Sequence, residues 1–121
     1  MQNIVSIRGA ITVRENSVKE IKSATTKLLN EVFKQNGIEE EKIINIIFTV
    51  TDDLDALNPA TVAREESKID SISMLCVQEM KVKSALSKCI RVMIQVYSNL
   101  KRDQIKHVYL GDAASLRPDL K

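Results

Sequence analysis

The chain has 121 residues, of which 18 are Lys or Arg and 16 are Asp or Glu, and its formal net charge at pH 7 is +2. This length favours one domain over residues 1–121, large enough to bury about two-thirds of the surface of the unfolded chain. The charges are scattered without a basic block, and the aromatic residues are only two Tyr and two Phe. We therefore expect neither a nucleic acid nor a membrane as partner.

The first predicted element is a strand over residues 4–13, which mix Ile, Val and Thr around Arg8. Gly9, beside that arginine, indicates a bulge or a close approach of another part of the backbone. The same end of the chain carries Arg14 and has no long apolar stretch, so neither a signal peptide nor a membrane span is predicted. A cytoplasmic protein is expected.

A helix is predicted over residues 18–35. Ser17 and Glu20 match a capping box, in which each side chain accepts a hydrogen bond from the backbone N–H of the other residue. Apolar residues follow at helical spacing, and Gly37 is suited to end the helix. The nearly continuous apolar run over residues 43–50 then predicts a strand that is covered on both faces.

Two short elements follow this strand. Asn58 and the proline after it are typical of a helix start, which predicts a helix over residues 59–66 that carries Arg64. Residues 71–77 alternate Ile, Met and Cys with Ser, Ser and Leu, and therefore predict a third strand that includes Cys76.

The fourth strand is predicted over residues 89–97, where apolar residues alternate with Arg91 and longer or polar side chains. Arg91 therefore faces away from the most apolar side of the strand. An arginine in a segment built for burial is costly unless an anionic group meets it, so Arg91 is a site candidate, paired with Glu79 just past the third strand. Residues 105–110 supply a short fifth strand that carries Tyr109.

The order of these elements indicates an α+β fold in a single domain, with four or five strands and one main helix. The sequence contains no repeat, low-complexity tract or long linker that would divide it. Because aromatic residues are scarce, the core must be built mainly from Ile, Val, Leu, Met and Ala.

Most kinds of catalytic site are poorly supported by these residues. A pairing of Cys76 or Cys89 with His107, the one histidine, lacks the pattern of a nucleophile with a base and an orienting group. The acids are dispersed and the three glycines are isolated, so we expect no metal centre, no phosphate loop and no cofactor. The two cysteines lack a disulfide framework, which suits a reducing cytosol.

The remaining candidates are arginines at strand ends and in short helical segments. A guanidinium group binds a carboxylate through two parallel hydrogen bonds, so a set of arginines suits a small ligand with several carboxylates. A carboxylate among them would accept a hydrogen bond from a ligand hydroxyl, and such a pocket catalyses by electrostatics alone. The candidates are Arg8, Arg64, Arg91 and Arg117, with Glu79, Cys76 and Tyr109 as hydrogen-bonding neighbours.

An ordered set of short blocks resembles the AroH-class chorismate mutases, nearly from end to end and without large gaps. The blocks around Arg91 and at the C-terminal end are the specific ones. The blocks are Arg8-Gly9-Ala10 followed by Thr12-Val13, Thr51 to Leu54, Val62-Ala63-Arg64-Glu65, Cys76 to Met80, Lys88-Cys89-Ile90-Arg91-Val92-Met93, His107-Val108-Tyr109-Leu110 and Leu116-Arg117-Pro118-Asp119-Leu120.

The resemblance implies a homotrimer in which each chain contributes a mixed five-stranded sheet to a trimeric pseudo-α/β barrel, with three active sites between subunits. It also implies the reaction, the Claisen rearrangement of chorismate to prephenate in phenylalanine and tyrosine biosynthesis. This intramolecular reaction needs neither a covalent intermediate nor a cofactor, and chorismate is then the small-molecule partner.

By similarity, two residues would be catalytic. Arg91 would contact the ether oxygen and a carboxylate, while Glu79 and the thiol of Cys76 would take the ring hydroxyl. As the C–O bond breaks ahead of C–C bond formation, negative charge develops on the ether oxygen. A fixed cation there stabilises the transition state more than the ground state.

The other residues that the resemblance implies are substrate-binding. Arg8 and Tyr109 would hold a carboxylate, and Arg64 would approach from a mobile rim. Leu116 and Arg117 would lie in a C-terminal segment that closes over the pocket. The resemblance further suggests that neighbouring subunits both contribute arginines.

The chain departs from the family's pattern at two positions. Asn58 stands where an aromatic residue often helps to wall the pocket, and Thr61 stands where the residue can be basic. Two other functions are weighed against the mutase: a non-catalytic trimeric module that binds an aromatic carboxylate and regulates another protein, and a small trimeric imine or enamine deaminase.

Overall fold

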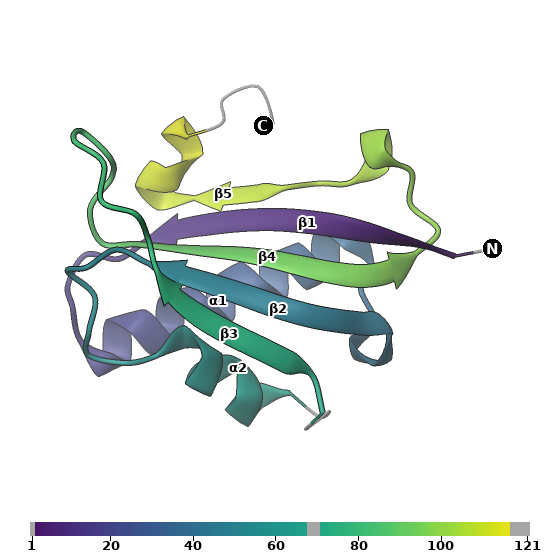
Figure 1. The fold of residues 1–121 in the computed structure, drawn as a ribbon, viewed down its shortest axis with the longest axis horizontal. Helices are drawn as coiled ribbons and strands as arrows, with labels where there is room; N and C mark the ends of the chain where they lie inside the picture. The colour runs from purple at the N-terminus through teal and green to yellow at the C-terminus, as the bar shows by residue number, and fades with distance from the viewer. Residues whose placement is uncertain (1, 68–70, 117–121) are drawn as a thin grey trace.

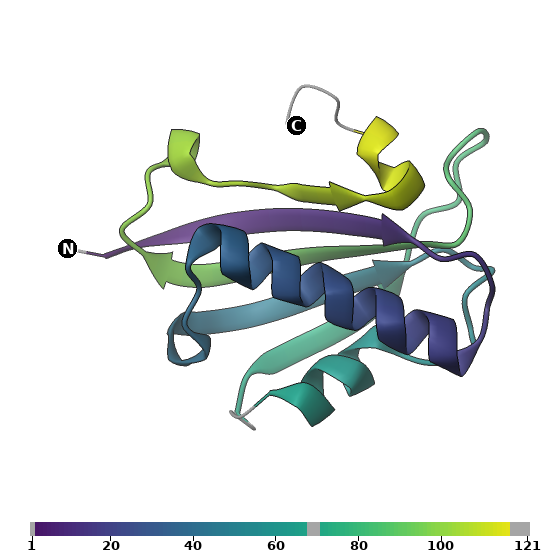
Figure 2. The same ribbon diagram turned by 180° about the vertical axis from the view of Figure 1, so that it is seen from behind.

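The computed structural model describes residues 2–67 and 71–116. These residues form one five-stranded sheet with both α-helices on the same face (Figure 1, and Figure 2 from behind). In chain order the elements are β1 (Asn3–Thr12), α1 (Val18–Asn36), η1 (Glu40–Lys42), β2 (Ile43–Val50), α2 (Pro59–Glu66), β3 (Ser73–Gln78), β4 (Cys89–Ser98), η2 (Arg102–Gln104), β5 (Val108–Leu110) and η3 (Gly111–Ser115), where η denotes a 3-10 helix.

The sheet is mixed, with strand order β3-β2-β4-β1-β5. β4 runs antiparallel to β1 and β2, whereas β3 is parallel to β2 and β5 is parallel to β1. The predicted α+β fold, with a mixed five-stranded sheet and one main helix, is therefore confirmed. The predicted short helix over residues 59–66 is α2, and Asn58 caps it by accepting a hydrogen bond from the Ala60 N–H at 2.9 Å.

Helix α1 is bounded as its capping residues predict. The hydroxyl of Ser17 accepts a hydrogen bond from the Glu20 N–H at 3.1 Å, and Gly37 follows the last turn with a φ of 59°. Only this half of the predicted capping box is seen. The carboxylate of Glu20 instead accepts a hydrogen bond from Arg14 at 3.4 Å.

The fifth strand is shorter than predicted, because the chain before it is bound to a helix. The side-chain N–H of Asn36 donates to the carbonyl of Lys106 at 2.8 Å, and the Lys106 N–H donates to Asn36 Oδ1 at 2.8 Å. These bonds occupy both backbone groups of Lys106, so regular β5 pairing begins only at Val108.

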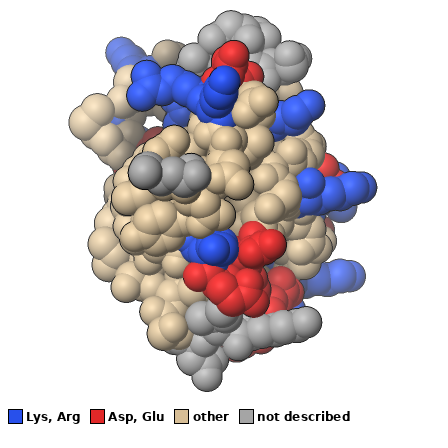
Figure 3. All heavy atoms as spheres, turned by 90° about the vertical axis from the view of Figure 1, so that its right-hand side faces the viewer, with Lys and Arg blue, Asp and Glu red and all other residues tan. Residues whose placement is uncertain are grey.

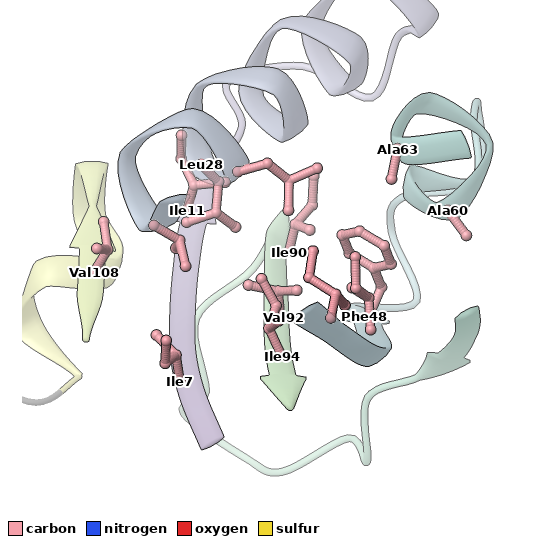
Figure 4. Packing of buried hydrophobic residues seen from close by; sticks show 14 of the residues in the cluster. Ile7, Ile11, Leu28, Phe48, Ala60, Ala63, Ile90, Val92, Ile94 and Val108 are labelled. Carbon is pink, nitrogen blue, oxygen red and sulfur yellow. The ribbon is translucent and has the colours of Figure 1, made fainter. Parts of the chain in front are cut away.

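The core lies between the sheet and the two helices (Figure 4). Its fully buried members include Ile7, Leu28, Phe48 and Ile90, which come from four different elements. At Gly9, an added Cβ would lie 3.1 Å from Leu28 Cδ1, so the glycine allows the close approach of α1 to β1. The register between β1 and β4 is unbroken there, which excludes the bulge considered from the sequence.

The opposite face of the sheet is open in the single chain, so the prediction that β2 is covered on both faces is wrong for one subunit. Both helices pack on the same side, and the other face exposes large apolar side chains. Exposed fractions there are 57% for Ile4, 62% for Leu75, 47% for Val77 and 47% for Tyr97. None of the described helices has the length and apolarity needed to cross a membrane.

Basic side chains are dispersed over one face of the molecule, whereas the acidic side chains on that face gather mainly in one group (Figure 3). On the face drawn in Figure 3, Lys and Arg side chains lie in several separate places with uncharged surface between them. This arrangement agrees with the scattered charges of the sequence and contains no continuous basic patch on that face.

Candidate active site

A cavity of about 450 Å³ opens on the helix-free face of the sheet, a volume in the range of small-ligand pockets. It is built from three central strands, β5 and the C-terminal end of the described chain. Its lining residues are Arg8, Gly9, Ile47, Thr49, Glu79, Arg91, Val92, Met93, Tyr109 and Leu116.

Strand register explains why these side chains share one face. Arg91 stands opposite Ala10 on one side and opposite Thr49 on the other, and Ala10 in turn stands opposite Tyr109. Residues that stand opposite each other in a sheet point to the same face. Arg8, two residues before Ala10, points the same way.

Arg91 and Glu79, which both line this cavity, form an ion pair. Arg91 Nε lies 3.0 Å from Glu79 Oε1, and the two side chains are 39% and 24% exposed. The N–H of Arg91 Nε is not directed at that oxygen, so this buried atom has no hydrogen-bond acceptor among the described residues. The charge of Arg91 is thus compensated, while part of its guanidinium remains accessible for a ligand anion.

Backbone contacts hold both members of the pair. Arg91 is the third residue of β4, and the Glu79 N–H donates to the carbonyl of Val50, the last residue of β2, at 2.7 Å. The sequence prediction that an acid meets Arg91 is confirmed by this geometry.

The C-terminal end of the described chain is attached to β1. The backbone turns at Gly111, which has a φ of 60°, and the Asp112 N–H then donates to Thr12 Oγ1 at 3.0 Å. The turn and this hydrogen bond bring Leu116 to the cavity, which Tyr109 also lines. Both pack against a small buried cluster on the same face, made of Ala10, Cys89 and Ala113.

His107 supports Arg8 through the backbone. Its Nδ1 atom accepts a hydrogen bond from the Arg8 N–H at 3.0 Å, next to the point where β5 pairs with β1. This bond gives His107 a structural role.

Two predicted site residues are not part of this cavity. Cys76 stands opposite the fully buried Phe48 and packs against the main core, so it lies on the helix-covered face. Arg64 is exposed on α2, which covers that same face. The single chain therefore does not bring them to Arg91, and Arg117 lies outside the described residues.

The cavity also contains residues that the sequence prediction missed. Thr49 stands opposite Arg91 on the neighbouring strand, and its hydroxyl is buried without a hydrogen-bond partner among the described residues. Ile47 and Met93, which are also a register pair, form the apolar wall. Every second residue of a strand lies on the same face, but only the register with β4 shows that Thr49 shares the face of Arg91.

Neither thiol is disposed for nucleophilic chemistry. Burial raises the pKa of both Cys76 and Cys89, and the guanidinium of Arg91 opposes that rise only at Cys89. A raised pKa disfavours the reactive thiolate. Within residues 2–67 and 71–116, no group of three His, Cys, Asp or Glu side chains is placed to bind a metal ion.

Comparison with known proteins gives a consistent result. Residues 4–120 match the family model described as chorismate mutase type I. The chain is 41% identical to chorismate mutase AroH of Bacillus subtilis over 97% of its own length and 92% of the relative's. It is 40% identical to chorismate mutase AroH of Thermus thermophilus, over 95% and 94% of the two chains. A solved chorismate mutase structure from Clostridium thermocellum superimposes with a TM-score of 0.88 at 48% identity, covering 92% of this chain and 98% of that one.

Proposed function

The chain belongs to the type I chorismate mutase family, and we propose that its cavity performs the family's reaction through Arg91 and Glu79. The enzyme is an isomerase that converts chorismate to prephenate, a step that the family places in aromatic amino acid biosynthesis. The observation that carries the proposed mechanism is the Arg91–Glu79 ion pair, with 3.0 Å between Nε and Oε1, in a cavity of about 450 Å³.

The reaction moves electrons within one molecule. The ether C–O bond breaks, a C–C bond forms at the other end of the enolpyruvyl group, and the double bonds shift, with no atom gained or lost. Because C–O cleavage runs ahead, negative charge develops on the ether oxygen. The Arg91 guanidinium is placed to stabilise that charge, and it does so more strongly in the transition state than in the substrate.

The other proposed contacts position the substrate. Glu79 holds the Arg91 guanidinium and accepts a hydrogen bond from the ring hydroxyl, while Arg8 and Tyr109 bind a carboxylate. Holding the enolpyruvyl group over the ring adds an orientation effect. A million-fold acceleration corresponds to about 8 kcal/mol, which these two effects supply together without proton transfer.

We further propose that the enzyme is a homotrimer with active sites between subunits. The support is the open apolar face of the sheet, where Leu75 is 62% exposed and Val77 is 47% exposed, together with the position of the cavity on that face. Apolar surface of this kind favours association. In this arrangement, Arg64, which is exposed on α2, reaches the cavity of a neighbouring subunit, while Leu116 lines the cavity of its own chain.

The activity is tested by following the loss of chorismate absorbance with purified protein. Turnover with formation of prephenate is expected. Binding of aromatic carboxylates without turnover would support the regulatory module instead, and turnover of imines without turnover of chorismate would support the deaminase. Family membership favours the mutase over both.

The shared site is tested by mixing two inactive variants. In trimers reassembled from equal amounts of Arg64→Ala and Arg91→Ala chains, a site is intact when Arg91 comes from one chain and Arg64 from the other. About a quarter of the sites then recover activity, by the statistics of random assembly around a symmetric ring. If both arginines serve a site within one chain, the mixture stays inactive.

Sedimentation of the parent protein at micromolar concentration gives the independent measure of assembly. A trimer is expected, and a clean monomer would contradict the proposal. A cytoplasmic location is likewise proposed, supported by the two free cysteines, and is checked by fractionation of the source cells.

A further inference from the structure

Two polar side chains just after β2 hold the first residues of β4. Thr51 Oγ1 accepts a hydrogen bond from the Cys89 N–H at 3.0 Å and donates its own proton to Asp53 Oδ1 at 2.5 Å. Both carboxylate oxygens of Asp53 also accept from the Lys88 N–H, at 3.1 and 3.0 Å. The backbone N–H of Thr51 completes the network by donating to the Cys89 carbonyl at 3.1 Å.

This network holds a backbone conformation that is otherwise unfavourable. Lys88 has a φ of 48°, in the left-handed region that residues with a side chain rarely adopt. Its N–H is bound by Asp53, and its carbonyl accepts from the Val13 N–H at 2.8 Å. Hydrogen bonds to an ionised carboxylate are stronger than neutral ones, so Asp53 compensates for the strain where the chain enters β4.

The network is directly connected to the ion pair of the active site. Arg91 follows Cys89 by two residues, and its register partner Thr49 precedes Thr51 by two. The Glu79 N–H is bound to the carbonyl of the residue before Thr51, at 2.7 Å. The end of β2 therefore sets the position of both charged side chains relative to each other.

We propose that Thr51 and Asp53 are positioning residues for the rearrangement, which hold the guanidinium of Arg91 at its working position beside Glu79. Neither residue needs to touch the substrate for this role. The cavity that Arg91 and Glu79 share with Arg8 and Tyr109 is lined by neither of them. Thr51 and Asp53 instead line a second cavity of about 450 Å³, which also contains Glu79 and Arg91. A displacement of about 1 Å in such a charge can reduce the rate about a hundredfold.

The test uses two disruptive variants, a conservative variant and a matched control. Thr51→Val keeps the shape of the side chain but removes its hydroxyl, whereas Thr51→Ser keeps the hydroxyl. Asp53→Asn removes the charge that Lys88 and Thr51 share. The control is Asp52→Asn, because Asp52 is the adjacent acid, with a side chain 46% exposed and a long ion pair of 3.6 Å to Lys81.

We expect Thr51→Val and Asp53→Asn to lower kcat about ten- to a hundredfold, with KM within about threefold of the parent value. Thr51→Ser and Asp52→Asn keep kcat within about threefold. The proposal is wrong if both disruptive variants keep the parent's kcat, or if Thr51→Ser loses as much as Thr51→Val.

A second readout does not depend on activity. Exchange of the Lys88 and Cys89 amide protons, measured by NMR on the assembled protein, should accelerate at least about tenfold in Asp53→Asn and Thr51→Val. Parent-like exchange in both variants would overturn the proposal. Because the proposal rests on the proposed mechanism, a parent without chorismate turnover contradicts that mechanism, whereas active variants with fast amide exchange contradict only the positioning role.

Discussion

Arg91 and Glu79 are in contact although another strand separates them. Arg91 belongs to β4, Glu79 follows β3, and β2 lies between these strands, yet Arg91 Nε is 3.0 Å from Glu79 Oε1. Strands two positions apart in a sheet are separated by about 10 Å, so only long side chains reach across. The length of both side chains is therefore as important as their charge.

Replacing Arg91 tests the charge itself. Arg91→Ala should lower kcat/KM at least about a thousandfold, equivalent to about 4 kcal/mol, because the developing negative charge loses its cation. Arg91→Lys should also be severely impaired, since a point charge on a flexible chain does not reproduce the planar guanidinium. Arg14→Ala is the control, because the Arg14 side chain is 88% exposed. An Arg91→Ala enzyme with near-parent turnover would exclude this mechanism.

Replacing Glu79 tests whether its side chain must be long enough to contact Arg91 across β2. Glu79→Asp keeps the charge but shortens the side chain by one methylene, so the carboxylate no longer reaches Arg91 across β2. We expect kcat to fall about tenfold or more for Glu79→Asp, and at least as far for Glu79→Gln, which loses the charge. Steady-state kinetics on trimeric protein give the measurement. Glu15→Gln, at an exposed glutamate, controls for an unspecific effect of lost charge. Full activity of Glu79→Asp would show that the contact across β2 is dispensable.

Replacing Asn36 tests how much its hydrogen bonds from α1 to Lys106, just before β5, stabilise the fold. Asn36→Ala removes the bonds to both backbone groups of Lys106 and should lower the free energy of unfolding by about 2–4 kcal/mol, because buried polar groups lose their partners. Urea unfolding followed by circular dichroism measures this change. Asn30→Ala, at an exposed position of the same helix, should be neutral or slightly stabilising. Equal stability of the two variants would contradict the role of Asn36.

The buried Cys89 thiol should make the free energy of unfolding depend on pH. Burial raises its pKa above the ordinary value of 9.0 in the folded protein, whereas in the unfolded chain it keeps the ordinary value. As pH rises past about 9, the unfolded state loses this proton first, so the free energy of unfolding decreases. Below that pH the thiol is protonated in both states and has no effect on the slope.

Comparison with Cys89→Ala isolates this contribution. The difference in unfolding free energy between parent and variant should be constant up to about pH 8.5 and should shift in favour of the variant above it. Lysine titration is common to both proteins and cancels in the difference. A constant difference up to about pH 10.5 would show that the Cys89 thiol titrates alike in both states.

Much of the fold was predictable because it depends on local pattern. Alternation in residues 89–97, the apolar run over residues 43–50 and the cap at Ser17 each indicate an element without reference to the rest of the chain, and β4, β2 and α1 confirm them. The short β5 was overestimated, because the side chain of Asn36, distant in sequence, occupies the backbone of Lys106.

The candidate site was predicted less completely. Arg91 was found because a charge in an apolar strand requires a partner, and Glu79 was found by resemblance and proximity. Thr49 was missed, since its place opposite Arg91 depends on the β2–β4 register. A shift of one residue would turn Thr49 to the helix-covered face, and the residues of a single strand do not determine that register.

The sequence by itself determined the type and order of the elements, the face on which Arg91 lies, and the family to which the ordered blocks point. These depend on the spacing of neighbouring residues along the chain. Only the tertiary structure decided that Glu79 reaches Arg91 across β2, that Cys76 lies on the other face, and that Thr51 and Asp53 bind the start of β4. Strand order and register bring together residues that are distant in sequence, and no local periodicity encodes that proximity.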